Sequence, residues 1–325
     1  MTVPLTILRT AAGSAPSVTQ YKIFRDLGLR VIAADSDPLS VGFVFADAAY
    51  QMPLVSSPRY FDALIEICRR ERVDWVLPAL DEELLILAGR RTELEACGAR
   101  LLSSSSECLE NCVDKRATHA FFRQNGIPTP ATWEPGSVCL ANFPVIVKPR
   151  RGRGGVGVYV ARDRQELEFF GSYVREAIIQ EFMTGRELTV DVLADFASNP
   201  LFIRPRYRIQ TESGISYKGA VVDHPGIVCW VEKIVHALGL IGPANIQCFV
   251  DESDGVWFTE INARLAGSVA LTFEADPAFP LALVCLLKGE SPQPATGPAK
   301  PLVMLRYWSE VYIEKSEVGL ICTHL

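Results

Sequence analysis

The sequence predicts an α/β protein in which a unit built on a parallel sheet is followed by an α+β unit with antiparallel strands. The first observation is the alternation of short β-rich runs with helical patterns before residue 102, which is typical of consecutive βαβ units. The second is the change after residue 113 to β-rich runs joined by short turns, a pattern that favours hairpins. With 325 residues and 49% hydrophobic side chains, the chain is long enough to bury two or three packed units.

The elements of the first unit follow from the spacing of its apolar residues. We expect strands at 5–8, 30–34 and 75–78, and helices at 17–27, 59–70 and 82–95. Asp81 is expected to cap the last of these helices. The first strand-to-helix loop holds one glycine, Gly13, and Asp35 ends the second strand. Because the full GxGxxG pattern is missing there, we favour a Rossmann-like packing unit and keep nucleotide binding by this loop as the alternative.

The second unit begins near residue 113. A helix is expected from Asp114 and Lys115 to Arg123, and the proline-containing segment 126–130 then forms an extended linker. A further helix is expected at 225–238 and a final strand at 303–314, while the pattern at 181–187 indicates a crossover between two subdomains. We therefore divide the chain into the units 1–112, 113–186 and 187–325.

Several classes of function lose support from the composition. The net charge of −6 argues against a nucleic-acid surface. No run approaches the roughly 18 consecutive apolar residues of a membrane helix, and the nine cysteines show no zinc-ligand spacing. The patterns of a P-loop, a zinc protease and a serine-hydrolase elbow are also missing. We expect a cytoplasmic protein whose partners are small molecules, with no nucleic acid and no membrane among them.

The clearest local signal for chemistry follows the strand that ends at Lys148. Gly152, Gly154, Gly155 and Gly157 match the spacing GxGxxG, but a β-rich run follows them where a dinucleotide fold would place a helix. We interpret the segment as a hairpin whose backbone N–H groups cover phosphates, with Lys148 as a fixed cation beside them. A flexible basic turn is the alternative. Because its three arginines are expected to be solvated, we predict that residues 150–157 form a mobile lid.

The crossover at 181–187 is a candidate nucleoside site. Backbone groups around Phe182 and Met183 would contact an adenine, Glu181 would accept from its amino group, and Glu187 would hold ribose hydroxyls. The alternative is that the two glutamates are simply solvated.

Three arginines alternate along one predicted strand. Arg204, Arg206 and Arg208 would share one face at the strand period of two, which predicts an anion platform for a carboxylate or phosphate. A solvated sheet face is the alternative.

A predicted hairpin gathers candidate metal ligands. If its turn places Val250 opposite Trp257, Gln247 lies opposite Glu260. Hard Mg²⁺ takes carboxylate and amide oxygens and completes its shell with water and phosphate. An amide-lined polar face is the alternative, but a lone acid in an apolar strand favours a metal site. The residues assigned to the metal are Gln247, Glu260 and Asn262, and Arg264 follows them on the same face.

Taken in order along the chain, these segments resemble the ATP-grasp superfamily, most closely its carbamoyl-phosphate-synthase-like branch. The segments that carry the resemblance are Asp114-Lys115, Lys148-Pro149, the glycine hairpin, residues 180–187 and residues 260–264. The resemblance implies a Rossmann-like pre-ATP-grasp domain (1–112), a small lid subdomain (113–186) and a large subdomain with the metal site and the C-terminal strand (187–325). It also implies the use of ATP with Mg²⁺ or Mn²⁺.

The resemblance implies roles for individual residues. Lys115 and Lys148 would contact the ATP phosphates, and Arg264 would face the transferred phosphoryl group. The residues that would border the acyl-phosphate site are Arg206, Arg208 and Lys218. The sequence departs from the family pattern at Gln247, where many relatives carry an acid, so Mg²⁺ binding would depend more on ATP itself.

The activity that the resemblance implies is that of an ADP-forming ligase, which activates a carboxylate as an acyl phosphate and joins it to an amine. Amino acids are the expected substrates, and a homodimer is a candidate assembly. A carboxylase that acts through carboxyphosphate is the alternative within this class. A nucleotide-binding regulatory protein without turnover, and an oxidoreductase that uses the first unit, are the alternatives from other classes; the degenerate loop at Gly13 argues against the last.

Overall fold

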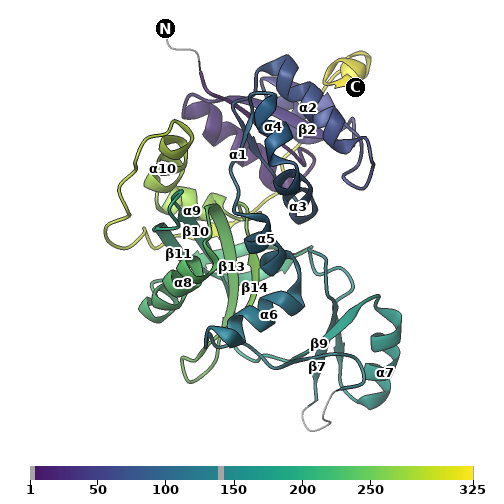
Figure 1. Cartoon of the computed structure of the whole chain (residues 1–325), viewed down its shortest axis with the longest axis vertical. Helices are drawn as coiled ribbons and strands as arrows, with labels where there is room; N and C mark the ends of the chain where they lie inside the picture. Colours follow the sequence, from purple (N-terminus) through teal and green to yellow (C-terminus); the bar gives the residue numbers. More distant parts are fainter. Residues whose placement is uncertain (1–3, 138–142, 325) are drawn as a thin grey trace.

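The computed structural model describes residues 4–137 and 143–324, which form three sheets surrounded by helices. Figure 1 shows the first sheet at one end of the molecule, the largest sheet in the middle and a small sheet at the opposite end. In this described part of the chain, no helix has the length and apolar character needed to cross a membrane.

The first sheet is parallel throughout, which confirms the prediction from alternating strands and helices. In spatial order its strands are β16 (Thr323–His324), β3 (Ala48–Gln51), β2 (Arg30–Asp35), β1 (Thr6–Arg9), β4 (Trp75–Leu77) and β5 (Arg100–Leu101). Its helical segments are α1 (Ala15–Asp26), η1 (Val41–Phe45), α2 (Tyr60–Glu71), α3 (Asp81–Gly89) and α4 (Arg91–Ala96). Apolar residues of α1 pack on one face, and those of α2, α3 and α4 pack on the other.

The middle sheet is antiparallel throughout, as predicted for the second unit. In spatial order its strands are β14 (Val256–Asn262), β13 (Gly242–Val250), β10 (Arg186–Ala194), β11 (Pro200–Glu212), β12 (Ile215–Val221) and β15 (Val303–Leu305). Its apolar face packs against α5 (Ser106–Val113), α6 (Lys115–Gln124) and α8 (Pro225–Leu238). Alternate residues of each strand face the other way, so the sheet has an apolar face and a polar face.

Two further helices connect the middle sheet to the first unit. These are α9 (Ala270–Ala275) and α10 (Ala278–Leu287), which share one hydrophobic core with α1 and the first sheet. Trp75 Nε1 in β4 donates a hydrogen bond of 2.8 Å to the carbonyl oxygen of Leu287. The first unit is therefore packed against the middle sheet through a continuous apolar core.

The small sheet confirms the predicted glycine hairpin. Its strands in spatial order are β6 (Thr132–Trp133), β9 (Ala177–Glu181), β7 (Val145–Pro149) and β8 (Tyr159–Ala161), and α7 (Arg164–Tyr173) packs on it. The antiparallel pairing of β7 with β8 places the glycine segment at a hairpin connection, and not at the start of a helix.

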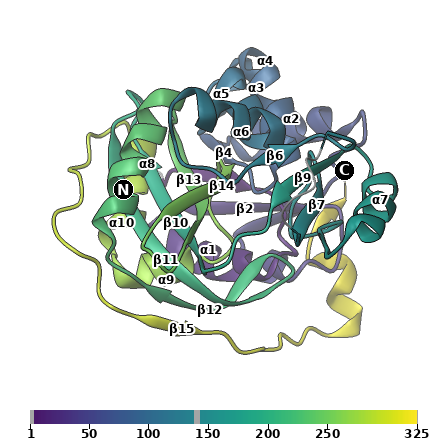
Figure 2. The same cartoon turned by 90° about the horizontal axis from the view of Figure 1, so that it is seen from below.

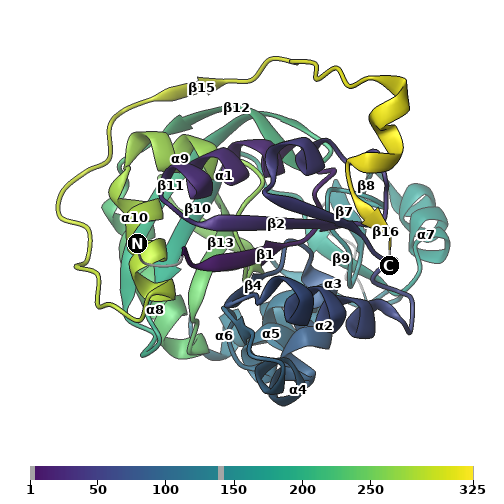
Figure 3. The same ribbon diagram turned by 90° about the horizontal axis from the view of Figure 1, so that it is seen from above.

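The C-terminal segment differs from the strand expected at 303–314. Only Val303–Leu305 forms a strand, and it pairs with β12 at the edge of the middle sheet. The chain then runs along the outside of the molecule through η2 (Lys315–Leu320) to β16, which pairs with β3 of the first sheet, as Figures 2 and 3 show. The strand stops at Leu305 because β12 pairs with it over only three positions.

Two local predictions require correction. The β13–β14 turn pairs Val250 with Val256 and not with Trp257, but a register shift between Gln247 and Cys248 restores the expected pairing of Gln247 with Glu260. Asp81 is the first helical residue of α3, not its cap; the side chain of Glu83 instead accepts a hydrogen bond of 3.2 Å from the backbone N–H of Leu80.

Candidate active site

The polar face of the middle sheet carries a continuous band of polar and charged side chains. In the register of the sheet, Thr189 lies opposite both Arg206 and Gln247, and Gln247 lies opposite Glu260. Residues opposite one another in register share a face. We call this set the polar band; its members are Glu187, Thr189, Asp191, Arg204, Arg206, Arg208, Asn245, Gln247, Glu260 and Asn262.

The three arginines of β11 share this face, but they do not form the expected open anion platform. Arg206 Nε and Nη2 donate to the carboxylate of Asp191 at 2.8 and 3.2 Å, and both side chains are only 1% exposed. Arg204 pairs with Asp276 at 2.6 Å. Internal carboxylates therefore neutralise these guanidinium groups, so the solvated face proposed as the alternative is wrong as well.

Within the described part of the chain, Arg208 makes two hydrogen bonds and one ion pair, and its Nε–H group makes no hydrogen bond. Its Nη1 donates to Thr189 Oγ1 at 3.3 Å and its Nη2 to the carbonyl of Gly214 at 3.0 Å. Its Nε forms an ion pair with Glu187 Oε1 at 3.2 Å but makes no hydrogen bond to any of the described residues. Burial raises the pKa of Glu187 and lowers the pKa of Arg208, so the pair lies in weakly solvated surroundings.

Two lysines from different elements meet beside the glycine hairpin. Lys148, on β7, is buried, and its Nζ donates to Gln180 Oε1 at 2.8 Å. Burial lowers the pKa of Lys148 to about 8, although the negative charge of Glu260 opposes this change, while the positive charge of Lys115 adds to it. Lys115 begins α6, and its Nζ donates to the carbonyl of Gly152 at 2.7 Å.

The negative charge of Glu260 acts on several cations of the site. Its carboxylate contributes to the electrostatic environment of Lys148, Arg208 and Arg264, and also to that of Glu187. These residues come from β7, β11, the segment after β14 and β10. The fold therefore gathers, around one carboxylate, charged residues that lie far apart in the sequence.

The oxygen donors around Glu260 fit a magnesium ion. Gln247 lies opposite Glu260, and Asn262 is held by a hydrogen bond of 3.2 Å from its Nδ2 to Asn245 Oδ1. Within residues 4–137 and 143–324, no group of three or more His, Cys, Asp and Glu side chains could hold a metal ion. One carboxylate with amide oxygens suits Mg²⁺ that takes its remaining ligands from water and phosphate.

Arg264 is paired with the first unit. Its Nε and Nη2 donate to the two carboxylate oxygens of Asp81 at 2.9 and 2.7 Å, and the side chains are 15% and 14% exposed. Burial alone would lower the pKa of Arg264, but the charge and hydrogen bonds of Asp81 produce a net rise. Asp81 was thus assigned a local capping role from the sequence, whereas its partner lies 183 residues away.

The side chains of the three arginines in the glycine hairpin are 39%, 47% and 43% exposed, in line with the solvation expected for residues 150–157, and each also forms an ion pair. Arg150 pairs with Asp114, Arg151 pairs with Glu110 at 3.0 Å, and Arg153 pairs with Glu82 at 3.1 Å. All four glycines have positive φ angles, between 67° and 146°. The pairs of Arg151 and Arg153 are exposed on both sides and contribute little to stability, whereas the Asp114 side chain that pairs with Arg150 is only 4% exposed.

The tip of the hairpin rests on the turn between β11 and β12. A Cβ atom added to Gly214 would lie 2.6 Å from the Cα of Gly154, so the two backbones approach as closely as only glycine permits. Gly214 also has a φ of +74°. The carbonyl of Gly214 also accepts the hydrogen bond from Arg208 Nη2, so this turn links the hairpin tip to a member of the polar band.

The crossover predicted to hold the nucleoside lies between β9 and β10. Glu181 is exposed, and its Oε2 accepts from the backbone N–H of Ala131 at 3.1 Å. Phe182 is exposed and Met183 is half-buried. Gly185 is required here, because a Cβ would lie 2.4 Å from the carbonyl oxygen of Val250.

Lys218 lies apart from this cluster. It is exposed on β12, in register with Gln210 on one side and Leu305 on the other. Three strands, β11, β10 and β13, separate β12 from β14, which carries Glu260.

His119 lies close enough to Lys148 to be affected by the charge of that lysine, and it was not assigned to the site from the sequence. It lies one helical turn after Lys115 on α6. Burial lowers its pKa, and the positive charges of Arg123 and Lys148 add to that effect. The spacing of four residues from Lys115 was the available signal.

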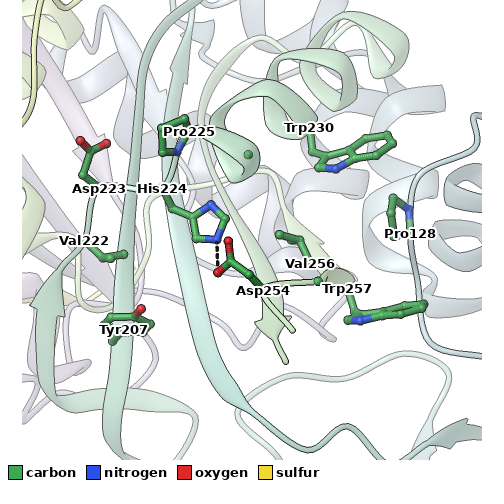
Figure 4. A pocket seen from close by; sticks show the side chains of 12 residues that line it. Pro128, Tyr207, Val222, Asp223, His224, Pro225, Trp230, Asp254, Val256 and Trp257 are labelled. Carbon is green, nitrogen blue, oxygen red and sulfur yellow. Dashed lines mark ion pairs between the residues drawn. The ribbon is translucent and has the colours of Figure 1, made fainter. Parts of the chain in front are cut away.

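A cavity of about 650 Å³ lies near the start of α8, away from the polar band. Tyr207, Trp230, Trp257 and the ion pair between His224 and Asp254, at 3.4 Å, line it, as Figure 4 shows. Tyr207 alternates with Arg206 and Arg208 on β11, so it faces the opposite side of the sheet. This cavity is therefore separate from the cluster around Glu260.

Comparison with known families matches both parts of the chain. Residues 7–102 match the PylC-like N-terminal domain, and residues 112–268 match the ATP-grasp domain. Residues 112–268 of the chain are thus an ATP-grasp domain, the domain that defines the ATP-grasp superfamily. Members of this superfamily are ATP-dependent ligases, in agreement with the class that the sequence motifs implied.

A curated relative matches most of the length of this chain. The chain is 27% identical over 292 residues to the carbamoyl phosphate synthase large chain of Methanothermobacter thermautotrophicus, a match that covers 81% of this chain. It spans only 27% of the length of that relative.

Solved structures share the fold. N5-carboxyaminoimidazole synthetase from Staphylococcus aureus, complexed with ADP, matches with a TM-score of 0.75 and 15% identity over 94% of this chain and 83% of that one. L-amino acid ligase from Bacillus licheniformis matches with a TM-score of 0.67 and 20% identity over 84% of this chain and 70% of that one.

Replacing Gly214 with alanine should displace the glycine hairpin of this ATP-grasp domain. The new Cβ would clash with Gly154, so tryptic cleavage after Arg150, Arg151 and Arg153 should become several-fold faster. Gly136→Ala is the matched control, because Gly136 also has a positive φ, +87°, but no described atom lies within 4 Å of its added Cβ. Equal cleavage rates in the two variants would show that the Gly154–Gly214 contact does not hold the hairpin.

Binding of MgATP near pH 8 should be accompanied by proton uptake at Lys148. Its pKa of about 8 leaves a large neutral fraction at that pH, and phosphate anions would raise this pKa by favouring the charged form. Affinity should therefore fall as the pH rises through about 8. Calorimetry in buffers of different ionisation enthalpy measures the uptake, and Lys148→Arg, which stays charged, should abolish it. If the wild-type protein binds MgATP without proton uptake, Lys148 does not contact the phosphates as predicted.

Proposed function

We propose that this chain is an ATP-dependent carboxylate–amine ligase that forms an amide or peptide bond through an acyl phosphate, with release of ADP and phosphate. The observation that supports this proposal is the convergence of Lys148, Arg208 and Arg264 on the charge of Glu260. Phosphoryl transfer requires mainly positioning and charge stabilisation, and this arrangement can supply both.

The nucleotide would lie between the glycine hairpin and the polar band. In this proposal Lys115 and Lys148 bind the phosphates, and Lys115 exchanges its present contact with Gly152 for a phosphate oxygen. The backbone at Gly152, Gly154, Gly155 and Gly157 covers the phosphates. Residues Glu181, Phe182 and Met183 contact the adenine, and Glu187 holds the ribose.

The proposed magnesium ligands are Gln247, Glu260 and Asn262. Bound there, the metal would neutralise phosphate charge during transfer. Glu260 would hold it directly, while the hydrogen bond from Asn262 to Asn245 keeps the Asn262 amide oriented. Mn²⁺ has the same preference for oxygen ligands.

The carboxylate substrate would lie where the arginines meet the phosphate site. Arg264 faces the transferred phosphoryl group, and Arg208, whose guanidinium lies beside Glu187, would lie next to the carboxylate substrate. Arg206 is buried against Asp191, so its proposed role is to position the strand and not to touch the substrate. Lys218 is proposed to border the acyl group at the edge of the site.

The proposed reaction has two balanced steps. A carboxylate oxygen attacks the γ-phosphorus and ADP leaves with the bond electrons. The amine then attacks the acyl carbon, phosphate leaves, and the amine nitrogen loses a proton. The docked glycine hairpin would exclude water that could hydrolyse the acyl phosphate first.

The proposed roles divide the chain into the three units expected from the sequence. We propose a nucleotide-covering unit at 113–186, a metal- and substrate-binding unit at 187–325, and a first unit at 1–112. Amino acids are the proposed acid and amine, and a homodimer is the proposed assembly.

Bicarbonate is a second candidate for the carboxylate. The relative with 27% identity is named carbamoyl phosphate synthase large chain. A reaction with bicarbonate would proceed through carboxyphosphate and would release ADP without an organic acid.

A coupled ADP-release screen tests the proposal. Amino acids are supplied singly and in pairs, with and without bicarbonate, and products are weighed by mass spectrometry. A ligase gives ADP release that depends on an organic acid and a product lighter by one water than the sum of acid and amine. ADP release with bicarbonate alone favours the second candidate, and no substrate-dependent release contradicts both.

Glu260→Gln should stay folded but lose turnover by about 10²-fold or more, because removing a charge-stabilising group at the transferred phosphate costs this much. MgATP binding should weaken in parallel. Glu252→Gln is the control, since Glu252 is an exposed acid in the turn of the same hairpin. Unchanged turnover in Glu260→Gln, or equal losses in the two variants, would remove Glu260 from the site.

A further inference from the structure

The first unit contacts the candidate active site through the residues that follow β14. Arg264 comes two residues after this strand, and Asp81, at the start of α3, holds it through a pair of hydrogen bonds. α3 lies against α5 at the boundary between the first unit and the middle sheet (Figure 1). The contact therefore joins a unit that carries none of the proposed nucleotide ligands to the residue proposed to face the phosphoryl group.

The geometry of this pair leaves part of the guanidinium free for a ligand. Asp81 occupies the edge formed by Nε and Nη2 of Arg264. The remaining nitrogen, Nη1, has only a long contact of 3.4 Å with the carbonyl of Leu265. An arginine held along one edge can still donate from the other, because its five N–H groups lie in a fixed plane.

The backbone just before Asp81 is held by Glu83. Glu83, two residues later in α3, is buried, and its Oε2 accepts hydrogen bonds from the backbone N–H of Ala79 at 3.1 Å and from Thr10 Oγ1 at 2.6 Å. Its Oε1 accepts from Tyr60 at 2.8 Å. The start of α3, from which the Asp81 side chain projects, is therefore anchored to the first unit.

A second contact fixes the same loop. Gln20 Nε2 donates to the carbonyl of Ala266 at 3.3 Å, while Arg9 Nε donates to Gln20 Oε1 at 2.8 Å. The backbone two residues beyond Arg264 is thus also held by the first unit. Gln20 and Glu83 are both buried, and the proposed chemistry does not otherwise use either side chain.

We infer that Asp81 is a positioning residue for phosphoryl transfer, through which the first unit fixes the guanidinium of Arg264 before the reaction begins. This inference rests on the proposed function. A donor that is already oriented needs no rearrangement when charge develops on the transferred group. An interdomain clamp with no role in catalysis would make the same contacts, so the test must separate stability from rate.

The test compares Asp81→Asn with Asp276→Asn in the full-length chain. The ion pair between Arg204 and Asp276 is a close match, with side-chain exposures of 15% and 14%, the same as for Arg264 and Asp81. Both variants should lose similar thermal stability. Asp81→Asn alone should lower kcat by about 10²-fold, with little change in the KM for ATP, because misplacing a catalytic contact acts on the transition state. Asp81→Glu should recover part of the rate.

A second measurement keeps the inference testable if the substrates differ from those proposed. Binding of MgADP with fluoroaluminate, which mimics a phosphoryl group in transfer, is compared with binding of MgADP alone. Wild-type protein and Asp276→Asn should bind the mimic at least about 10-fold more tightly than MgADP, and Asp81→Asn should lose this difference. If the ligation screen fails but the three proteins bind the mimic as expected, the proposed ligation is contradicted and the positioning role of Asp81 still stands. Identical behaviour of the two variants in rate and mimic binding, or no preference of wild-type protein for the mimic, would overturn the inference.

Discussion

The opposite character of the two faces of the middle sheet is the constraint on which the candidate site depends. Once α5, α6 and α8 cover the apolar face, every second residue of β10, β11, β13 and β14 must face the other side. Charges on that side are largely removed from water, and an unpaired buried charge would destabilise the fold by about 3–5 kcal/mol. Arg206 and Asp191, each 1% exposed, show how the fold meets this requirement. Paired acids and arginines allow a cationic site in a chain whose net charge is −6.

The site is assembled from all three units of the chain, and the charges of its residues influence one another. Glu260 acts on Lys148 from the small sheet and on Arg264, which the first unit holds through Asp81. A nucleotide that binds Lys148 would therefore change the environment of the arginines as well. The glycine hairpin is docked mainly by exposed ion pairs and one close contact, so it can respond to that change without disturbing the buried pairs.

The sequence predicted what depends on local pattern. The parallel first sheet, the antiparallel second unit and the glycine hairpin all follow from periodicity and turn residues, and Gln247 lies opposite Glu260 despite a register error at the turn. The partners of the arginines could not be predicted, because Asp276 and Asp81 lie 72 and 183 residues from the arginines they bind. Asp191 was within reach of sequence reasoning: it is the one charged residue in the apolar run from Val190 to Ala194, and such a residue requires a buried partner. The role of Asp81 was misread because helix capping is a local explanation and the tertiary contact took precedence.

The central claim is that a carboxylate oxygen attacks the γ-phosphate, and transfer of that oxygen tests it most directly. The acid substrate is labelled with ¹⁸O in its carboxylate, turnover is run with MgATP and the amine, and the released phosphate is weighed. An acyl phosphate predicts that each phosphate carries one oxygen from the acid. Unlabelled phosphate, or label found in AMP, would contradict the account.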